Sequence, residues 1–525
     1  MAALRHPGVH PFSGWNIPDL LARQAAARGD HPFLIWEPFE GEPRQWSFAG
    51  FAHEVDRLAA GLQARGLQAG ERLLIHMDNC PELLIAWYAC ARLGAVAVTT
   101  NARSAGAELA YFADHSGAVA ALTQPRFAEL VNAHCRNLRW LAVTAQDSEG
   151  IPGPAGGFAE SYEALLGEAE ALRAPRPDAM AEVGIQYTSG TTSRPKGVVW
   201  THANALWGGK VNAKHQDLRP EDVHLCYLPT FHTNAQTYSL LAALWAGASC
   251  VLQPRFSASR FWPVSLKHRC TWTSMVPFCL KALAVREHPA EHHYRLWGNG
   301  ICEPPTDAQF GVKTIGWWGM TETMTHGIVG DVHHANRPLS IGRPADEYGI
   351  AILDDDGRPV AAGETGHLRV LGIPGLSLFE RYLDNPQATA EAFDDQGWFI
   401  TGDRVTLNED GSISFADRDK DMLKVGGENV AASEIEQVIV ELPSVAEVAV
   451  VARAHAMLDE VPVAFVLPDG TAPDGLADEV LDLCRARLAD FKVPAEVRVV
   501  DSLPRATLEK IAKAQLRRQL ADEPA

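Results

Sequence analysis

The sequence lacks the marks of several protein classes. Its nine cysteines include no C-x-x-C pair, so zinc ribbons and dithiol redox sites are not expected. It has no run of about 18 apolar residues, which a transmembrane helix needs. Residues 1–7 do not contain the apolar core of a secretory signal. We therefore expect a cytoplasmic protein with no integral membrane segment, whose thiols stay reduced.

Basic residues are also scarce. The chain has 46 Lys and Arg residues against 65 Asp and Glu residues, which gives a formal net charge of −19. This balance disfavours a nucleic-acid-binding surface, so no nucleic-acid partner is expected. A local cationic site can still bind an anionic small molecule. The length of 525 residues predicts two or more domains, and the 46% hydrophobic content is that of a globular protein.

The segment Tyr187–Gly197, which reads YTSGTTSRPKG, is the most informative part of the chain. Its glycines let the backbone approach an anion, and its hydroxyl groups donate hydrogen bonds to phosphate oxygens. Arg194 and Lys196 supply positive charge. An ordinary surface loop is the competing interpretation, but strand-like apolar runs flank the segment on both sides. The spacing differs from the GxxxxGK[ST] motif, so we predict a polyphosphate loop of another kind.

The segment 316–323, which reads GWWGMTET, is a second candidate site. Trp318 offers a ring that stacks on a nucleobase, and Gly319 allows close backbone approach. Thr321 offers a hydroxyl for a phosphate, and Glu322 is a hard oxygen ligand that suits Mg²⁺. A buried aromatic patch followed by a helix N-cap at Thr321 is the alternative. The phosphate-type loop elsewhere in the chain favours the functional interpretation.

Three later segments carry weaker patterns. Asp403 follows a glycine and has the chemistry to accept both hydroxyls of a ribose, although the local sequence alone favours an ordinary Gly-Asp turn. Residues 418–430 join charged residues to a double glycine and then to a helix, which fits either a solvated linker or a hinge. Lys510 lies near the C-terminus, where a lysine is usually only solvated, so its position alone assigns it no role.

Hydrophobic periodicity predicts the fold class as α/β, with a large N-terminal domain and a small C-terminal one. Helices alternate with short strands from about residue 17, which indicates layers with parallel sheets. Residues 340–420 contain short strands and Asp-Gly turns, which predict a small β-barrel or sheet. The remainder predicts an α+β unit, with Ser433 as the N-cap of a helix at 433–442. We expect domains at 1–419 and 420–525.

Together these segments, in this order, resemble the ANL superfamily of adenylate-forming enzymes. The resemblance runs from about residue 17 to 520, and the segments Thr188–Gly197 and Trp318–Glu322 are its most specific parts. The loop with Ser193 is similar to that of the crotonobetaine/carnitine-CoA ligase and fatty acyl-CoA ligase branch. Membership implies a large N-terminal domain of layered α/β subdomains, a small β-barrel, and a mobile α+β C-terminal domain.

The resemblance implies roles for individual residues of the N-terminal part. The β- and γ-phosphates of ATP are expected on Thr188, Ser189, Gly190, Thr191, Thr192 and Lys196. Trp318 stands, with Gly319, where the superfamily usually carries a Tyr that stacks on adenine. Thr321 is expected at the α-phosphate and Glu322 at Mg²⁺. His232 matches a residue beside the acyl pocket.

Further roles are implied nearer the C-terminus. Asp403 is expected to accept the ribose hydroxyls, with Arg418 beside it. Lys420 matches the hinge between the domains. Gly426 and Gly427 match a loop that lines the pantetheine tunnel of CoA. Lys510 matches the lysine that contacts the carboxylate and the phosphate during adenylation, although Ala506 and Glu509 replace the usual Thr and Gly before it.

The resemblance implies an ATP-dependent acyl-CoA ligase. A carboxylic acid attacks ATP to form acyl-AMP and release pyrophosphate, and the thiol of CoA then displaces AMP. Two alternatives stay open: an adenylating enzyme that loads a carrier protein in trans, and a half-reaction or non-catalytic relative. The class of the acid also stays open among betaine-like, fatty, aryl and terpenoid acids. Whether the chain forms a homodimer is a further open question. Trp207, Trp297, Trp317 and Phe278 either line an acyl pocket, as an aromatic cage for example, or belong to the core.

Overall fold

The computed structural model describes residues 8–147, 150–153, 157–188, 195–418, 422–504 and 511–522. The chain forms two compact units. The first unit comprises Met1–Ala102, Ala113–Gln186 and Gly197–Asp417, and the second comprises Arg103–Phe112, Tyr187–Lys196 and Arg418–Ala525. Within the described ranges, no helix is both long and apolar enough to cross a membrane.

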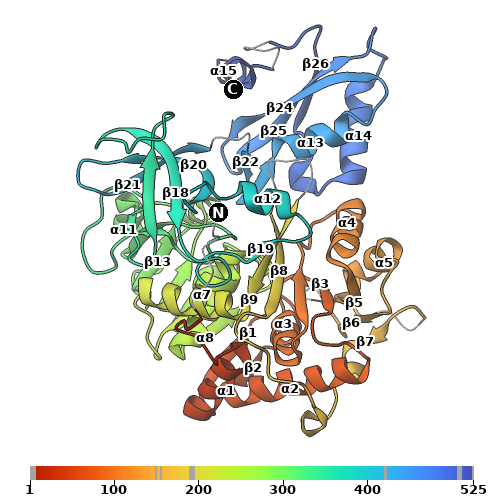
Figure 1. Cartoon of the computed structure of the whole chain (residues 1–525), viewed down its shortest axis with the longest axis vertical. Coiled ribbons are helices and arrows are strands. Elements are labelled where there is room, and N and C mark those ends of the chain that lie inside the picture. Colours follow the sequence, from red (N-terminus) through yellow and green to blue (C-terminus); the bar gives the residue numbers. More distant parts are fainter. Residues whose placement is uncertain are drawn as a thin grey trace. The chain divides into compact units, whose positions relative to one another are not determined.

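A nine-stranded sheet forms one layer of the first unit (Figure 1). Its central strands are parallel, and antiparallel strands lie at both edges. In spatial order the strands are β16 (Arg343–Pro344), β15 (Ile328–Val329), β14 (Lys313–Trp318), β13 (Leu296–Asn299), β12 (Trp272–Ser274), β10 (Val223–Cys226), β11 (Ser249–Leu252), β1 (Pro32–Trp36) and β2 (Arg44–Ser47).

An eight-stranded sheet forms a second layer. From β3 the chain forms β4 on one side and then β5 on the other, and all three strands are parallel. Such a reversal of strand order opens a crevice at the carboxyl ends of the strands. The spatial order is β19 (Arg381–Tyr382), β9 (Lys196–Thr201), β8 (Glu182–Thr188), β4 (Val96–Thr99), β3 (Arg72–His76), β5 (Ala118–Thr123), β6 (Trp140–Val143) and β7 (Glu160–Ser161).

Helices of the first unit share a core with strands of both sheets. Leu20, Phe51, Leu84, Leu206 and Leu244 lie in one cluster of buried apolar side chains. The helices that contribute them are α1 (Ile17–Arg28), α2 (Phe48–Ala64), α3 (Pro81–Leu93), α7 (His202–His215) and α8 (Ala242–Ala246). A π-helix, η2 (Asn234–Leu241), leads directly into α8. The alternation of helices with parallel strands expected from the periodicity is thus confirmed.

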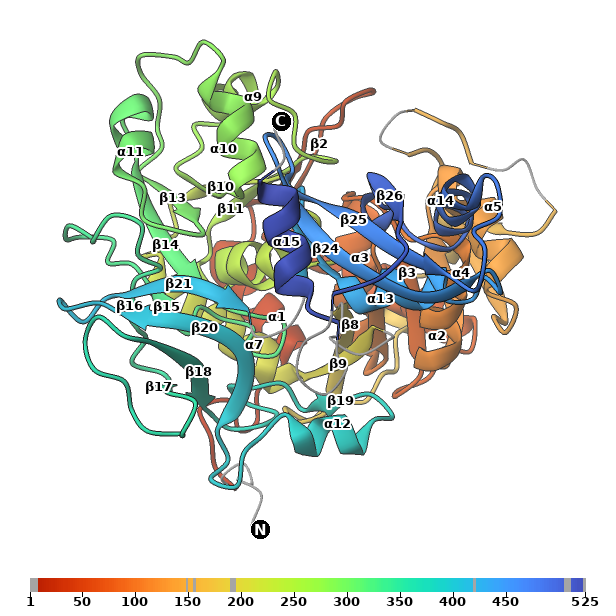
Figure 2. The same cartoon turned by 90° about the horizontal axis from the view of Figure 1, so that it is seen from above.

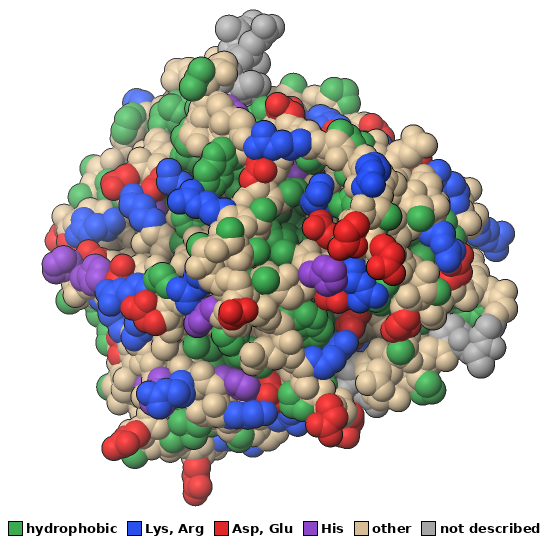
Figure 3. Space-filling model, turned by 90° about the horizontal axis from the view of Figure 1, so that it is seen from below, with side chains coloured by type: hydrophobic (Ala, Val, Ile, Leu, Met, Phe, Trp, Pro, Cys, Tyr) green, Lys and Arg blue, Asp and Glu red, His purple; other side chains and the backbone are tan. Residues whose placement is uncertain are grey.

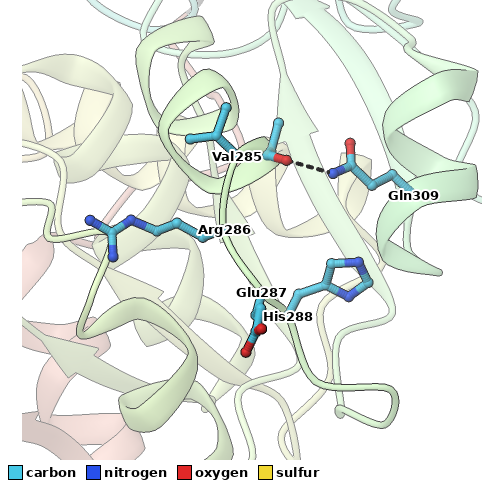
Figure 4. A pocket seen from close by; sticks show the side chains of 6 residues that line it. Val285, Arg286, Glu287, His288 and Gln309 are labelled. Atoms are coloured by element: carbon cyan, nitrogen blue, oxygen red, sulfur yellow. Dashed lines mark hydrogen bonds between the residues drawn. The ribbon is translucent and has the colours of Figure 1, made fainter.

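Other helices that the structure describes before residue 392 lie outside this group. They are α4 (Gly106–Ser116), α5 (Pro125–His134), α6 (Tyr162–Leu165), the 3₁₀ helix η1 (Ala169–Ala171), α9 (Phe261–Lys267), α10 (Pro277–Ala284), α11 (Pro304–Phe310) and α12 (Pro386–Glu391). A depression of about 590 Å³ lies between the C-terminal end of α10 and α11 (Figure 4). All its lining side chains are exposed, so it is an open surface groove.

The β-rich segment of the sequence forms an antiparallel four-stranded sheet within the first unit. Its strands, in spatial order, are β17 (Gly349–Leu353), β18 (Thr365–Leu371), β20 (Phe399–Leu407) and β21 (Ile413–Arg418). The register between β18 and β20 shifts between the pairs His367↔Arg404 and Arg369↔Ile400. This irregularity is a β-bulge, which bends a strand and turns its side chains in a new direction.

The second unit has a five-stranded sheet with helices on both faces. The strands are β22 (Met422–Val425), β23 (Glu428–Ala431), β24 (Val445–His455), β25 (Asp459–Pro468) and β26 (Glu496–Val499). Alternate residues of β24 face opposite sides, as a pleated strand requires. Val450 packs with α13 (Ala432–Ile439) and α14 (Leu476–Arg487), whereas Val451 packs with α15 (Lys513–Ala521). These contacts put α14 and α15 on opposite faces of the sheet, and Figure 2 shows both helices beside its strands.

Two local expectations for the second unit need correction. Ser433 is not an N-cap, because α13 begins at Ala432 and Ala431 precedes it without a side-chain capping bond. The double glycine does not lead directly into the helix, because a strand intervenes. Gly426 and Gly427 form a two-residue hairpin between β22 and β23, with φ of +58° and +92°. Positive φ at both central residues is the requirement of a type I′ hairpin, which explains the two glycines.

A buried ion cluster lies inside the second unit. The Lys492 ammonium, at the end of the 3₁₀ helix η3 (Asp490–Lys492), donates to the carboxylates of Glu108 and Glu434. All three side chains are less than 10% exposed. Because Glu108 lies on α4, this cluster joins the segment Arg103–Phe112 to the C-terminal part of the chain.

Acidic and basic side chains are interspersed on one face of the protein (Figure 3). On the face that Figure 3 shows, Lys and Arg side chains alternate with Asp and Glu side chains. The negative formal charge is therefore not gathered in one region of that face.

A carboxylate fixes the amino ends of three parallel strands in the first sheet. Asp222, which is 3% exposed, precedes β10 and accepts hydrogen bonds from Thr271 before β12 (2.7 Å) and from Arg295 before β13 (2.6 and 2.9 Å). Arg295 also donates to the carbonyls of Gln216 and Asp217 after α7. Burial alone raises the pKa of Asp222, but the hydrogen bonds and charge of Arg295 outweigh it and hold that pKa below its ordinary value.

We expect Asp222→Asn to lower the free energy of unfolding by about 2–3 kcal/mol, the range for charged hydrogen bonds at a buried site. Asp56→Asn is the control, because its pair with Arg92 is about one-third exposed and is expected to contribute under about 1 kcal/mol. Urea denaturation measures both. Since the pKa of Asp222 is lower in the folded state, the difference from wild type should narrow as the pH falls below about 4. Equal losses in the two variants would contradict the assignment.

Candidate active site

The segment Trp318–Glu322 leaves the carboxyl end of a parallel strand. Trp318 is the last residue of β14, and residues 321–323 form a turn. The alternative of a helix N-cap at Thr321 is therefore wrong. A Cβ atom on Gly319 would lie 2.3 Å from the Tyr238 hydroxyl oxygen and 2.4 Å from the Thr325 carbonyl oxygen. Only glycine fits at position 319, because the Tyr238 hydroxyl and the Thr325 carbonyl approach its backbone closely.

Asp403 enters the site from the bulge in β20. Gly402 has a φ of +74°, and nothing lies within 4 Å of the position its Cβ would take, so its backbone conformation is what favours glycine. The Thr401 hydroxyl accepts the N–H of Asp403 at 3.1 Å and donates to the carbonyl of Leu368 at 2.8 Å. Asp403 is 2% exposed. The bulge thus turns a carboxylate into the interior of the first unit.

Aromatic donors hold both carboxylates of the candidate site. The indole Nε1 of Trp318 donates to Oδ2 of Asp403 at 2.8 Å. The hydroxyl of Tyr382 donates to Oε1 of Glu322, also at 2.8 Å. Burial, followed by the charge of Glu322, raises the pKa of the Tyr382 phenol, so this phenol stays protonated and remains a donor. Sequence reasoning missed Tyr382, which stands in a short edge strand and matches none of the motifs.

The Thr321 hydroxyl lies in a polar chain beneath the turn. Its oxygen is 3.2 Å from the hydroxyl oxygen of Thr233, which donates to Oε1 of Gln186 at 2.9 Å. The Gln186 amide in turn donates to Gln236 at 2.6 Å. The Thr233 hydroxyl thus faces two acceptors, Gln186 Oε1 and the Thr321 oxygen, and its single proton serves one of them at a time. Gln236 lies in the π-helix, a type of helix often found at functional sites.

His232 lies in the same loop as Thr233, immediately before the π-helix. Its carbonyl accepts the N–H of Gln236, and its ring centroid is 4.7 Å from that of Phe231. The loop follows β10, so it emerges at the same carboxyl edge of the sheet as Trp318. The structure therefore brings the segment with His232 to Thr321 through its neighbour Thr233.

The four aromatic residues considered for an acyl pocket do not gather. Trp297 is fully buried and Phe278 packs at the edge of the same cluster. Trp317 stacks on His326 in a second cluster, with ring centroids 4.3 Å apart. Trp207 contacts Phe12 and Tyr348 beside the main core. They lie in three separate clusters, so these four residues do not form one aromatic cage.

Other residues predicted for the site fall in the second unit or outside the described residues. Thr188 ends β8 and Lys196 begins β9, and these strands are neighbours in their sheet. Arg418 ends β21, and Gly426 and Gly427 form the hairpin. The residues that lie outside the described ranges are Ser189, Gly190, Thr191, Thr192, Lys420 and Lys510.

Protein-family models match both parts of the chain. The model described as AMP-binding enzyme matches residues 21–383, and the model of the AMP-binding enzyme C-terminal domain matches residues 434–510. The first match contains Trp318, Thr321, Glu322 and Tyr382, and Asp403 lies between the two matches.

Relatives and solved structures agree with this match. The crotonobetaine/carnitine–CoA ligase of Salmonella heidelberg (strain SL476) is 35% identical over 525 residues, which cover 96% of this chain and 99% of that protein. The structure of o-succinylbenzoate CoA synthetase from Bacillus subtilis, bound to a product analogue, is similar with a TM-score of 0.80 at 26% identity, covering 95% and 98% of the two chains. The structure of ATP-bound MatB from Rhodopseudomonas palustris gives 0.69 at 27% identity, covering 97% and 99%. The chain therefore belongs to the AMP-binding enzymes of the ANL superfamily and is an AMP-forming acyl-CoA synthetase, with ATP, CoA and a small-molecule carboxylic acid as substrates.

Proposed function

We propose that the first unit binds ATP around the two buried carboxylates. In this proposal the ring of Trp318 contacts adenine, Asp403 accepts the ribose hydroxyls, and Thr321 donates to the α-phosphate. The observation that carries the proposal is the pair of bonds from Trp318 to Asp403 and from Tyr382 to Glu322. Each bond keeps a charged, nearly buried acceptor in a fixed place, as a site for hydroxyl groups or a cation requires.

Glu322 fits a Mg²⁺ ion that arrives with ATP. Mg²⁺ is commonly bound by one or two carboxylates together with substrate phosphates. In the part of the chain that the structure describes, no group of three or more acidic, His or Cys side chains is arranged to hold a metal by itself. A single carboxylate with a fixed orientation suits this shared mode, and the ion supplies charge neutralisation when bound. Tyr382 would orient that carboxylate.

Thr321 is arranged to donate to a phosphate while it keeps its contact with Thr233. The Thr233 hydroxyl donates to the Thr321 oxygen at 3.2 Å, so Thr321 uses its own proton for an α-phosphate oxygen. Thr233 also contacts Gln186, and it thereby holds the oxygen of Thr321 in place. This gives Thr233 and Gln186 a positioning role beneath the reacting phosphorus.

The second unit is proposed to supply the remaining groups. We propose that Thr188, Ser189, Gly190, Thr191, Thr192 and Lys196 bind the β- and γ-phosphates and that Arg418 lies beside the ribose. Lys510 would contact the acid and the α-phosphate, and His232, from the first unit, would lie beside the acid. We propose a domain boundary at 419/420 and a hinge at Lys420, so that Lys510 leaves the site before the hairpin at Gly426 and Gly427 guides the thiol of CoA.

The acid class rests on the relatives. We propose a betaine-type acid, because the crotonobetaine/carnitine–CoA ligase relative aligns over 96% of this chain. The four aromatics that lie apart do not supply its cage, so the ammonium group must be recognised by other side chains.

Pyrophosphate release with a panel of betaine, fatty, aryl and terpenoid acids tests this class. We expect kcat/KM to be highest for crotonobetaine or carnitine, and CoA to be required for thioester formation. A higher kcat/KM for a fatty or aryl acid would contradict the proposed class, while leaving the activity itself in place. A carrier protein that replaces CoA at equal rate would favour the carrier-loading alternative.

Lys510→Ala is expected to lower ATP–pyrophosphate exchange by about 10²–10³-fold, the effect of removing one preorganised group that stabilises developing charge. Thioester formation from supplied acyl-AMP should remain close to wild type, because that step does not use the lysine. Lys513→Ala is the control: this nearby lysine pairs with Glu436 at 2.7 Å and is expected to retain exchange. If the Lys510 variant exchanged pyrophosphate at the wild-type rate, the assignment of Lys510 to adenylation would be wrong.

Lys420→Pro is expected to slow thioester formation and to leave pyrophosphate exchange near the wild-type rate. Proline fixes φ, so it restricts rotation of the chain at a hinge without touching the adenylation residues. Lys420→Ala removes the same side chain but leaves the backbone free, and it should retain both half-reactions. Rapid-quench measurement of the two steps distinguishes these cases, and equal loss of both steps in the proline variant argues against the hinge.

A further inference from the structure

The bond between Trp318 and Asp403 joins two segments that are far apart in the sequence. Trp318 ends β14 in the nine-stranded sheet, and Asp403 stands in the bulge of the four-stranded sheet. Their side chains are 6% and 2% exposed, and the N···O distance is 2.8 Å. A charge-assisted bond at this depth is stronger than a neutral one and is not exchanged readily for water.

The indole ring has little freedom to move. A Cβ atom on Gly327 would lie 3.0 Å from Cζ3 and 3.3 Å from Cε3 of Trp318, so the backbone of Gly327 packs closely against the six-membered ring. The N–H of Gly327 donates to the Trp318 carbonyl at 2.9 Å, and Trp318 pairs with Ile328 across β14 and β15. The ring therefore holds its N–H in one direction, toward the carboxylate.

The bond from Trp318 uses one acceptor position of Asp403. A carboxylate offers about four such positions, so this bond by itself is compatible with acceptance of ribose hydroxyls. Because the indole is neutral, it orients Asp403 without cancelling its charge. Phenylalanine has no donor, and the tyrosine hydroxyl extends from the tip of its ring, so neither reproduces a donor on the edge of the five-membered ring.

We infer that Trp318 is a positioning residue for Asp403, and that this enzyme discriminates the sugar of its nucleotide through the indole N–H. The inference rests on the proposed function, in which Asp403 accepts the ribose hydroxyls. The same side chain then serves two parts of the nucleotide: its ring contacts the base, and its N–H fixes the acceptor for the ribose. Loss of the N–H alone should weaken recognition of the ribose while the base contact remains.

The test replaces the N–H and keeps the ring. Trp318→Phe removes the donor, and 3-benzothienylalanine incorporated at position 318 substitutes sulfur for the N–H in a bicyclic ring of nearly the same shape. Two quantities are measured: the Kd of AMP and of 3′-deoxy-AMP by calorimetry, and kcat/KM for ATP and 3′-deoxy-ATP in pyrophosphate exchange. Trp317→Phe is the matched control, because it changes the adjacent tryptophan, which stacks on His326.

We expect both position-318 variants to bind AMP about 10- to 100-fold more weakly, the range for a charged hydrogen bond. Binding of 3′-deoxy-AMP should weaken much less, so the preference for the ribose falls. The KM for ATP should rise with little change in kcat, and Trp317→Phe should keep the preference. A double-mutant cycle with Asp403→Asn should be strongly non-additive, because both changes remove the same interaction.

Two outcomes would overturn different parts of the argument. The benzothienyl variant could raise the Kd of AMP and of 3′-deoxy-AMP by the same factor, or could change neither Kd. Either result would mean that Trp318 acts only through its ring, and the inference would fail. If Asp403→Asn alone leaves the ribose preference of the wild type unchanged, Asp403 is not the ribose acceptor, and the proposed function of that residue fails instead. Thermal unfolding of the benzothienyl variant near the wild-type temperature excludes misfolding as the cause of a loss.

Discussion

The burial of two carboxylates is the constraint on which the candidate site depends. Glu322 and Asp403 are 5% and 2% exposed. A buried carboxylate without donors takes up a proton instead of remaining charged. Each of these groups has a neutral aromatic donor, the indole of Trp318 or the phenol of Tyr382. Because these two donors are neutral, their bonds orient the carboxylates without adding positive charge, which suits the proposed roles toward a cation and ribose hydroxyls.

The nine-stranded sheet and the four-stranded sheet together position the side chains of the candidate site. Trp318 and the loop before the π-helix emerge at the carboxyl edge of the parallel strands, where ligands bind in folds of this kind. Asp222 and Arg295 fix the amino ends of the same parallel strands. The carboxyl ends that carry the site are therefore held in place relative to one another. Asp403 arrives from a separate antiparallel sheet, and only the bulge at Gly402 directs it inward. The four-stranded sheet is thus part of the site as well as a neighbour of it.

Motifs in the sequence predicted the residues whose chemistry is local, and the structure explains why the others were missed. Trp318, Thr321 and Glu322 are consecutive, so their residue types suggested a site before any fold was known. Tyr382 carries no such pattern, because its role depends on a contact with Glu322 across 60 residues. Thr233 and Gln186 belong to a network of the same long-range kind. Ser433 failed as a predicted cap because a preceding hairpin strand moved the helix start to Ala432. The four aromatic residues were considered for one pocket because of their residue type alone. In the structure they pack in three separate clusters.

The polar chain beneath Thr321 connects this residue to the loop that carries His232, which in the proposed function are the phosphate side and the acid side of the site. Thr233 belongs to the loop that carries His232, and it contacts both Thr321 and Gln186. The Gln186 amide donates to Gln236, which lies in the π-helix that follows the same loop. A shift of that loop would therefore move the Thr233 hydroxyl that donates to the Thr321 oxygen. In a protein interior, where unsatisfied polar groups are costly, such a shift is opposed by every member of the chain. Under the proposed roles, the positions of His232 and Thr321 both depend on one hydrogen-bonded network, and both loops leave the same edge of one sheet.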